Sequence, residues 1–291
     1  MLCCNIKKGM VKDFYCGTSL TSCNSVICLR FSAACCGCGV VVGDLWIGAV
    51  GTMITLTNLT AGYDRRPAVH HLSGTFAQGT LTAVVGPNGG GKSTLLKIIA
   101  GFLRPLSGSL QSPERQNIAY LPQTCEIDKS FPITVFDTVM LGASRTLGML
   151  RGASPAQREQ CLHALEAVGM VAFANRPIGA LSSGQLQRVL FARLMLMEAD
   201  VLLLDEPFSA IDTRTTADLL QLMQAWHKAG KTIITVLHDM HQAAAYFPES
   251  LMLAREKIAW GATRDVLCEE NLHKARLMAE HWHETAEACA L

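Results

Sequence analysis

The sequence predicts an α/β fold with a largely parallel sheet, and three apolar runs with the residues that follow them lead to this prediction. The runs are residues 81–85, 201–204 and 232–237. Continuous apolar runs are typical of strands that are buried on both faces of a parallel sheet. Each run is followed by glycine or by polar side chains, at the edge where such sheets bind ligands. The length of 291 residues suits one large α/β domain or two smaller lobes.

A glycine-rich loop, residues 86–94, follows the first run. It reads Gly-Pro-Asn-Gly-Gly-Gly-Lys-Ser-Thr and precedes a helix-forming segment, residues 95–100. A phosphate-binding loop needs this context, because glycines let several N–H groups point at one anion and the helix N-terminus adds partial positive charge. Lys92 can reach the β- and γ-phosphates of a nucleotide, and the Ser93 hydroxyl can bind Mg²⁺. A chance match is the alternative, which the register of Lys92 and Ser93 disfavours.

Ionisable side chains follow the other two runs. Asp205 and Glu206 come directly after residues 201–204, and His238 comes directly after residues 232–237. Because the two strands are predicted to be parallel, these side chains are expected at the same edge of the sheet. A lone histidine at a strand end is more often structural. Its predicted place beside two acids favours a chemical role.

Two further features have a functional and an ordinary interpretation. Ser182 and Gln185 form a capping box before an amphipathic helix, which makes either a second anion site or a simple helix cap. Tyr63 follows a predicted turn at residues 58–62 and is expected to be exposed in a polar loop. Such an aromatic ring can stack on a purine base, and an ordinary loop tyrosine is the alternative.

The remaining elements are read from local pattern. Residues 125–180 form helices and lack strand rhythm, so we interpret them as an inserted helical lobe, with one helix opened by Ser154 and Pro155. The other expected elements are a strand at residues 53–57, a turn at 107–109, a strand at 117–121, a helix at 213–228, a hairpin at 251–260 and a mostly helical tail from residue 263.

Residues 1–52 differ from the rest in composition, since eight of the twelve cysteines precede Met53. The single Cys-x-x-Cys pair at residues 35–38 lacks the second pair that a structural zinc site usually needs. The apolar stretch at residues 31–50 is interrupted by Asp44, which makes it a poor membrane span, and no cleavage site indicates a signal peptide. We interpret these residues as an extension that is disordered or not translated, with Met53 as the natural start.

Net charge and hydropathy exclude two classes of protein. The formal net charge is +1, which argues against a nucleic-acid-binding surface. From Met53 onward no apolar run is long enough to span a bilayer. An ATP-using loop also implies the cytosol, where disulfides are rare, so none is expected.

Taken together, the motifs resemble in order and spacing those of the ATP-binding cassette (ABC) ATPases. The resemblance covers roughly residues 53–260. It implies a P-loop NTPase cassette at residues 53–262 with a mixed or parallel core sheet and an N-terminal antiparallel β subdomain. It also implies an inserted α-helical subdomain at about residues 125–195 and a helical tail at 263–291. The motifs that carry it are residues 86–94, Gln123, 181–185, 203–207, 209–212 and His238.

The resemblance implies a role for each matching residue. Glu206 would be the general base, His238 would contact the γ-phosphate, and Asp212 would help to align a dimer. Ser183 departs from the family, which usually has glycine there. The implied ATP-binding residues are Tyr63, Gly86, Pro87, Asn88, Gly89, Gly90, Gly91, Lys92, Ser93 and Thr94. The implied catalytic residues are Lys92, Gln123, Glu206 and His238; the Mg²⁺ ligands are Ser93, Gln123 and Asp205; and the signature acting on the second protomer is Ser182, Ser183, Gly184 and Gln185.

Residues 130–142 resemble the zinc and manganese uptake branch of this family. The implied function is ATP hydrolysis that drives metal import, with zinc first, manganese second and iron chelates third. The implied partners are a second copy of the chain, membrane permease subunits and, indirectly, an extracytoplasmic solute-binding protein. The chain would then be peripheral, on the cytoplasmic face of the membrane.

Three alternatives stay open. A non-hydrolysing, ATP-dependent dimerisation switch would need a damaged Glu206 or His238, and both are intact. An exporter subunit would carry the same motifs. His273, His281 and His283 suggest metal sensing, but a spacing of two places His281 and His283 on different helix faces, which favours solvated side chains.

Overall fold

The computed structural model describes residues 53–63, 66–114, 117–123, 126–144, 152–209 and 211–288, with side chains described as far as residue 280. Residues 1–52 lie outside these ranges, so the interpretation of the cysteine-rich extension concerns residues that the structure does not describe. Among the described residues, no helix has both the length and the apolarity that a membrane span requires.

The core is a six-stranded sheet in the order β5-β6-β7-β3-β8-β9. The strands from β5 to β8 are parallel, and only β9 is antiparallel to its neighbour. The mixed, mainly parallel sheet expected from the apolar runs is therefore present. The strands are β3 (Leu81–Val85), β5 (Ile118–Leu121), β6 (Val201–Asp205), β7 (Thr232–Val236), β8 (Glu249–Ala254) and β9 (Glu256–Ala262).

A separate antiparallel sheet has the order β2-β1-β4, with β1 at Ile54–Tyr63, β2 at Arg66–Phe76 and β4 at Ser107–Gln111. The turns expected at residues 58–62 and 107–109 are wrong. The strand β1 continues to Tyr63 with register shifts, and Asn58 takes a left-handed φ of 48° within it. The residues that favour a turn therefore form β-bulges within the strand. The strand continues through them because the side chains of Leu59 and Ala61 are fully buried.

Two hydrophobic clusters cover the two faces of the core sheet. Val84, Leu203 and Ile234 face the cluster shared with α1 and the antiparallel sheet. Their neighbours on the other face, such as Leu204 and Ile233, pack with the helices of the other cluster. Side chains of successive strand residues point to opposite faces, so both faces need apolar residues, which explains the continuous runs.

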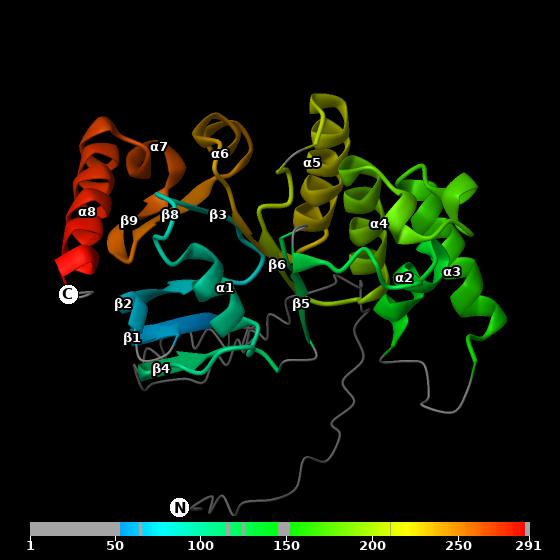
Figure 1. Ribbon diagram of the computed structural model, residues 1–291, viewed down its shortest axis with the longest axis horizontal. Helices are drawn as coiled ribbons and strands as arrows, with labels where there is room; N and C mark the ends of the chain where they lie inside the picture. Colours follow the sequence, from blue (N-terminus) through cyan, green and yellow to red (C-terminus); the bar gives the residue numbers. More distant parts are fainter. Residues whose placement is uncertain are drawn as a thin grey trace, which may run out of the picture. The chain divides into compact units, whose positions relative to one another are not determined.

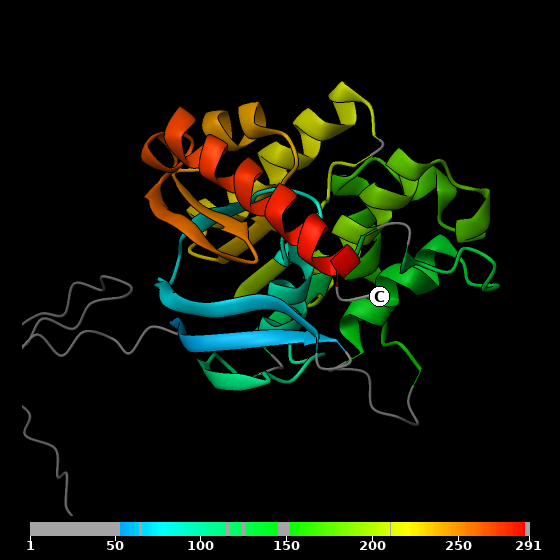
Figure 2. The ribbon, with the colours of Figure 1, turned by 60° about the vertical axis from the view of Figure 1, so that its left-hand side comes forward.

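Figure 1 shows where several of the helices lie relative to the two sheets. The helix α1 lies between the two sheets, and α2, α3 and α4 gather in a lobe beside the β5 edge. At the opposite edge α8 packs on β8 and β9 (Figure 2). The bounds are α1 (Lys92–Ile99), α2 (Val135–Met140), α3 (Pro155–Ala167), α4 (Ser183–Leu196), α5 (Thr213–Lys228), α6 (Met240–Tyr246), α7 (Thr263–Val266) and α8 (Glu269–Ala288), with short 3₁₀ turns at Leu141–Ala143, Val171–Phe173 and Ile178–Ala180.

Side-chain caps fix where the helices begin. Ser154 and Gln157 form a capping box before Pro155, so α3 starts where the sequence predicts. Asp212 caps α5, and Asp239 caps α6, a helix that the sequence analysis did not anticipate. Each cap satisfies backbone N–H groups that have no partner within the helix.

The Ser154 cap gives a stability prediction. Replacing Ser154 by alanine should lower the free energy of unfolding by about 1 kcal/mol, because the hydroxyl accepts the Gln157 N–H in the first turn of α3. Urea unfolding followed by circular dichroism measures this change. Ser112→Ala, at an exposed position outside the helices, is the matched control, and equal midpoints for the two variants would contradict the prediction.

Candidate functional site

The glycine-rich loop between β3 and α1 is held against backbone from two other strands. A Cβ added at Gly86 would lie 2.0 Å from the Leu253 carbonyl oxygen, and one at Gly91 would lie 2.3 Å from the Ala68 carbonyl oxygen. Both glycines have positive φ, 143° and 86°, which an L side chain rarely adopts. The Arg255 N–H donates to the Gly90 carbonyl at 2.9 Å. These glycines are thus required for the close packing of the loop against the two strands.

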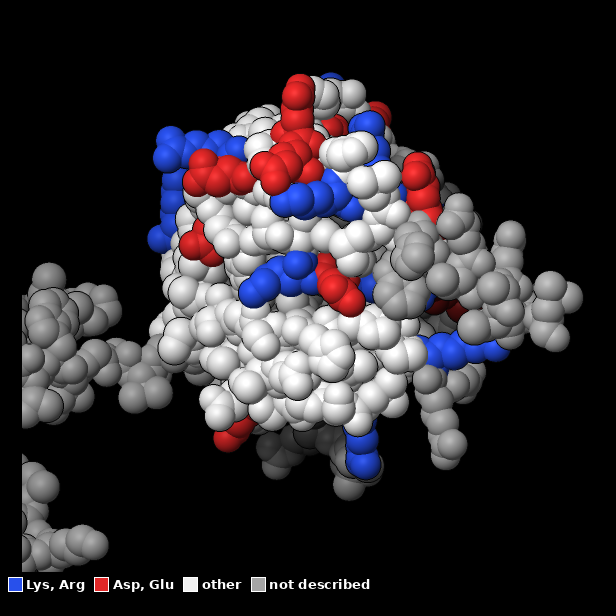
Figure 3. Space-filling view, turned by 90° about the vertical axis from the view of Figure 1, so that its left-hand side faces the viewer, with Lys and Arg blue, Asp and Glu red and all other residues white. Residues whose placement is uncertain are grey.

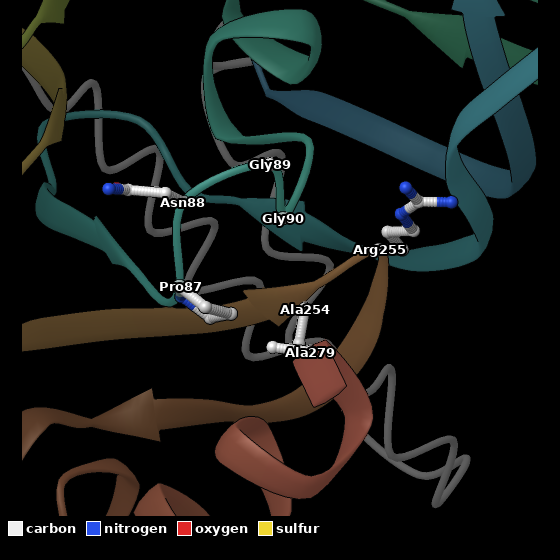
Figure 4. A pocket seen from close by; sticks show the side chains of 7 residues that line it. All are labelled: Pro87, Asn88, Gly89, Gly90, Ala254, Arg255 and Ala279. Carbon is white, nitrogen blue, oxygen red and sulfur yellow. The ribbon is translucent and has the colours of Figure 1, made fainter. Parts of the chain in front are cut away.

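Figure 4 shows a small pocket on the β8 side of this loop. Pro87, Asn88, Gly89 and Gly90 form one wall, and Ala254, Arg255 and Ala279 of α8 complete the lining. Asn88 and Gly89 are exposed, whereas Gly90, Gly91 and Thr94 are buried. The loop therefore has an exposed tip and a buried base.

Lys92 lies inside the loop. Its ammonium nitrogen donates to the carbonyl oxygens of Gly86 and Pro87 at 2.9 and 2.8 Å. Burial lowers the pKa of Lys92, and the carboxylates of Glu206 and Asp205 oppose that change. The ammonium group is thus bound by the loop and lies within electrostatic range of both acids, which places a positive charge where anionic phosphate oxygens would be cradled.

Asp205, at the end of β6, is fully buried and is bound by two hydroxyl groups. Ser93 donates to its Oδ1 at 2.9 Å and Tyr120 to its Oδ2 at 3.3 Å. Burial raises the pKa of Asp205, while the hydrogen bonds from Ser93 and Tyr120 lower it. Hydroxyl and carboxylate oxygens are hard ligands of the kind that Mg²⁺ prefers, so this pair of residues fits a magnesium site.

Tyr120 is a site residue that the sequence analysis missed. It pairs in register with Leu203 of β6, and Asp205 is two residues further along that strand, so all three side chains share one face of the sheet. Burial, with the Asp205 carboxylate next in effect, raises the pKa of the Tyr120 phenol far above its usual range. The phenol therefore acts as a hydrogen-bond donor at neutral pH.

Glu206 and His238 are paired, as their places after two parallel strands suggested. The His238 Nε2 atom lies 2.5 Å from Glu206 Oε1, and the Ser209 hydroxyl donates to Glu206 Oε2 at 3.2 Å. Adjacent register explains the pairing, because Asp205 of β6 aligns with Val236 of β7. Glu206 has a left-handed φ of 48°, which turns the chain away from the strand at this point. The contacts with His238 and Ser209 orient both carboxylate oxygens of Glu206.

Gln123 and Tyr63 lie at the margins of this group. Gln123 is half-buried and follows the end of β5, whose Leu121 aligns with Leu204 of β6. Tyr63, expected in a loop, is the last residue of β1, where it is 47% exposed and aligned with Arg66. The hydrogen bond to Glu126 is the main cause of the raised pKa of Lys97, and the nearby Tyr63 phenol adds a smaller contribution.

The signature residues stand apart from the phosphate-binding loop within one chain. Ser182 and Gln185 form the predicted capping box of α4, and Ser183 is the first residue of that helix. Ser183 has no left-handed φ, so the glycine usual in the family is not required by backbone conformation here. In Figure 1 the helix α4 is separated from α1 by β5 and β6. The structure thus assembles Lys92, Ser93, Asp205, Glu206 and His238 and leaves the signature outside this group.

Charge is mixed on the face that carries α8. Figure 3 shows Lys, Arg, Asp and Glu interspersed over its upper part, with few charges at the height of the antiparallel sheet. Pairs such as Lys274 and Glu270, whose atoms lie 2.6 Å apart, balance one another, so this face carries no extended field of one sign. Within the described residues no group of three His, Cys, Asp or Glu side chains could hold a metal ion. His273 is exposed, and the side chains of His281 and His283 lie outside the described ones.

Comparison with known sequences finds the family that the motifs suggested. A family model described as ABC transporter matches residues 69–209. The manganese transport system ATP-binding protein MntB of Listeria monocytogenes is 40% identical over 226 residues, which cover 76% of this chain and 94% of that protein. The zinc transport system ATP-binding protein TroB of Treponema pallidum is 37% identical over 235 residues, which cover 79% of this chain and 88% of that protein.

Two solved structures extend the similarity to the fold. An ABC transporter assigned to the metal-chelate type, in an inward-facing conformation, matches with a TM-score of 0.69 and 29% identity over 76% of this chain and 88% of that one. A bacterial Atm1-family ABC exporter with ATP bound matches with a TM-score of 0.63 and 28% identity over 81% of this chain and 42% of that one. The predicted cassette fold is confirmed. The chain therefore belongs to the ABC transporter family, as one of its ATP-binding ATPases.

Proposed function

We propose that this chain hydrolyses ATP to drive the import of a divalent transition-metal ion through a separate membrane permease. The observation that carries the hydrolytic part is the Glu206–His238 pair beside Asp205 and Lys92. The assignment of the transported metal rests on relatives named for manganese and for zinc transport, which are 40% and 37% identical to this chain. As in the sequence analysis, zinc is the first choice, manganese the second and iron chelates the third.

The residues at this edge divide the work of phosphoryl transfer. Phosphoryl transfer depends on positioning and charge stabilisation more than on covalent chemistry. Ser93 and Asp205, with Gln123, would hold Mg²⁺, whose charge offsets that of the β- and γ-phosphates. Lys92 and the loop N–H groups would neutralise the remaining phosphate charge. Tyr63 would stack on the adenine ring.

Glu206 would accept the proton of the attacking water. As the water oxygen bonds to the γ-phosphorus, the bond from that phosphorus to the bridging oxygen breaks and ADP leaves. His238 and Ser209 hold the two oxygens of Glu206, which keeps the base oriented, and His238 is placed to contact the γ-phosphate. A switch without hydrolysis would not need an oriented base.

The active form would be a head-to-tail dimer. The helix α4, which begins with the signature, is separated by β5 and β6 from α1, the helix that follows the phosphate-binding loop of the same chain (Figure 1). A second copy could bring its Ser182 hydroxyl and Gly184 amide to the bound nucleotide, with Ser183 and Gln185 beside them. Asp212 would align the two chains. Each dimer would then enclose two ATP molecules.

The dimer would sit on a permease at the cytoplasmic face of the membrane. The similarity to an inward-facing transporter of the metal-chelate type supports this arrangement. On the other side of the membrane, a solute-binding protein would deliver the ion to the permease. The similarity to an ATP-bound exporter keeps export as the alternative direction.

Replacing Glu206 by glutamine tests the hydrolytic assignment. Phosphate release should fall by about 10²–10⁴-fold, because a positioned base contributes that much, while Mg·ATP binding measured by fluorescence titration should stay within about twofold. Glu159→Gln, at an exposed position on α3, is the matched control and should keep full turnover. Unchanged phosphate release in Glu206→Gln would show that Glu206 is not the base.

Metal content tests the transport assignment. Cells that lack this chain should grow poorly under zinc chelation and contain less zinc, and the intact chain should restore both, whereas Glu206→Gln should not. The measurement is elemental analysis of cells grown under zinc chelation and under manganese limitation. A defect confined to manganese or iron would show that zinc is the wrong ion and would leave the assignment as a transport ATPase intact. If Glu206→Gln restored growth and zinc content, hydrolysis would not be needed, and the chain would act as an ATP-binding switch rather than as a transport motor.

A further inference from the structure

Arg188 joins three helices at one point. It lies in the second turn of α4, the helix that begins with the signature, and its side chain is 22% exposed. Its Nη1 atom donates to the Val168 carbonyl at 3.2 Å, at the end of α3. Its Nη2 atom donates to Asp218 Oδ2 at 2.8 Å and to Thr215 Oγ1 at 3.1 Å, both on α5. A planar guanidinium is suited to such divergent contacts.

The contact with Thr215 sets the direction of a hydrogen-bond chain. Because a guanidinium can only donate, the Thr215 hydroxyl oxygen accepts, and its own hydrogen goes to Asp212 Oδ1 at 2.8 Å. The Thr215 N–H donates to Asp212 Oδ2, also at 2.8 Å. Bonds aligned in this way strengthen one another. Arg188 therefore acts on the Asp212 carboxylate through Thr215.

The same carboxylate lies against the signature of its own chain. A Cβ added at Gly184 would lie 3.5 Å from Asp212 Oδ1 and 3.8 Å from Thr215 Oγ1. The start of α4 and the turn before α5 thus form one continuous surface, with Arg188 behind it. In the dimer proposed above, this is the surface that faces the second copy.

We propose that Arg188 is a positioning residue that keeps the signature and Asp212 in a fixed relation, so that both engage the second copy together. This inference rests on the proposed dimeric function. Nucleotide binding to the chain's own phosphate-binding loop uses Lys92 and Ser93, on the other side of β5 and β6. Loss of the Arg188 contacts should therefore weaken dimer closure and turnover without weakening that first binding step.

Two substitutions separate this role from general stabilisation. Arg188→Lys keeps the charge and can still pair with Asp218, but an ammonium cannot reproduce the guanidinium geometry at Val168 and Thr215. Thr215→Val removes the relaying hydroxyl at nearly the same volume. Thr215→Ser restores that hydroxyl and is the rescue variant. Arg214→Lys, at an exposed neighbouring position on α5, is the matched control.

The experiment measures steady-state phosphate release in full-length chains with Glu206 intact. The ATP affinity of the monomer and ATP-induced dimerisation are measured in full-length chains that also carry Glu206→Gln, so that bound ATP is not hydrolysed. Arg188→Lys and Thr215→Val should each lower kcat and the dimerisation constant by about tenfold, as expected for loss of a hydrogen bond to a charged group. Monomer ATP affinity should stay unchanged, and the melting temperature should fall by no more than about 4 °C, because only about 1 kcal/mol of hydrogen bonding within the chain is lost. The double variant should be no worse than either single one, because both interrupt one chain. Thr215→Ser and Arg214→Lys should match the parent.

Three results would overturn the inference. They are additive losses in the double variant, no rescue by Thr215→Ser, and a fall in monomer ATP affinity that parallels the fall in kcat. Failure of the proposed function looks different. In that case the parent chain with Glu206→Gln would itself not dimerise on ATP.

Discussion

The close packing of the glycine-rich loop against the end of β8 is the constraint on which the site depends. The Gly86 Cα approaches the Leu253 carbonyl so closely that no side chain fits, and the Gly90 carbonyl accepts the Arg255 N–H. The loop is therefore fixed by the backbone of a strand far away in sequence. Because Lys92 and Ser93 follow directly in α1, their positions relative to Asp205 are set by the same contacts. A mobile loop would have to be ordered by the ligand, at a cost to affinity.

The buried carboxylate of Asp205 shows a balance between stability and function. Taking a carboxylate out of water is costly unless hydrogen bonds compensate, and Ser93 and Tyr120 supply one to each oxygen. Lys92 adds a positive charge and Glu206 a negative charge near this carboxylate. A core built for stability alone would place an apolar side chain here. The arrangement is instead ready to accept a cation between hydroxyl and carboxylate oxygens, as the proposed Mg²⁺ site requires.

The sequence predicts the parts of this site that depend on local pattern. Apolar runs identify the parallel strands, and polar residues after them identify the functional edge, so Asp205, Glu206 and His238 are found without any contact information. Tyr120 is missed because its role depends on strand order and register, which place it beside β6. The turns expected in β1 and β4 are wrong for a related reason. Asn58 and Gly62 are turn formers locally, yet pairing with β2 and burial of Leu59 draw them into a bulged strand.

The separation of the two functional groups within one chain connects nucleotide binding to assembly. The Ser182 hydroxyl oxygen already accepts the Gln185 N–H in its own cap, yet a hydroxyl has a hydrogen left to donate, so the cap and an anion can share it. The edge of the sheet that carries Glu206, the proposed base, and Lys92 lies apart from the signature of the same chain. If the second copy supplies that signature, ATP binds the closed dimer better than the single chain. By mass action, a ligand that binds the closed dimer more tightly must favour dimer formation. Hydrolysis of the bound ATP must then allow the two copies to separate, and this alternation of closing and opening is the cycle that a transport motor needs.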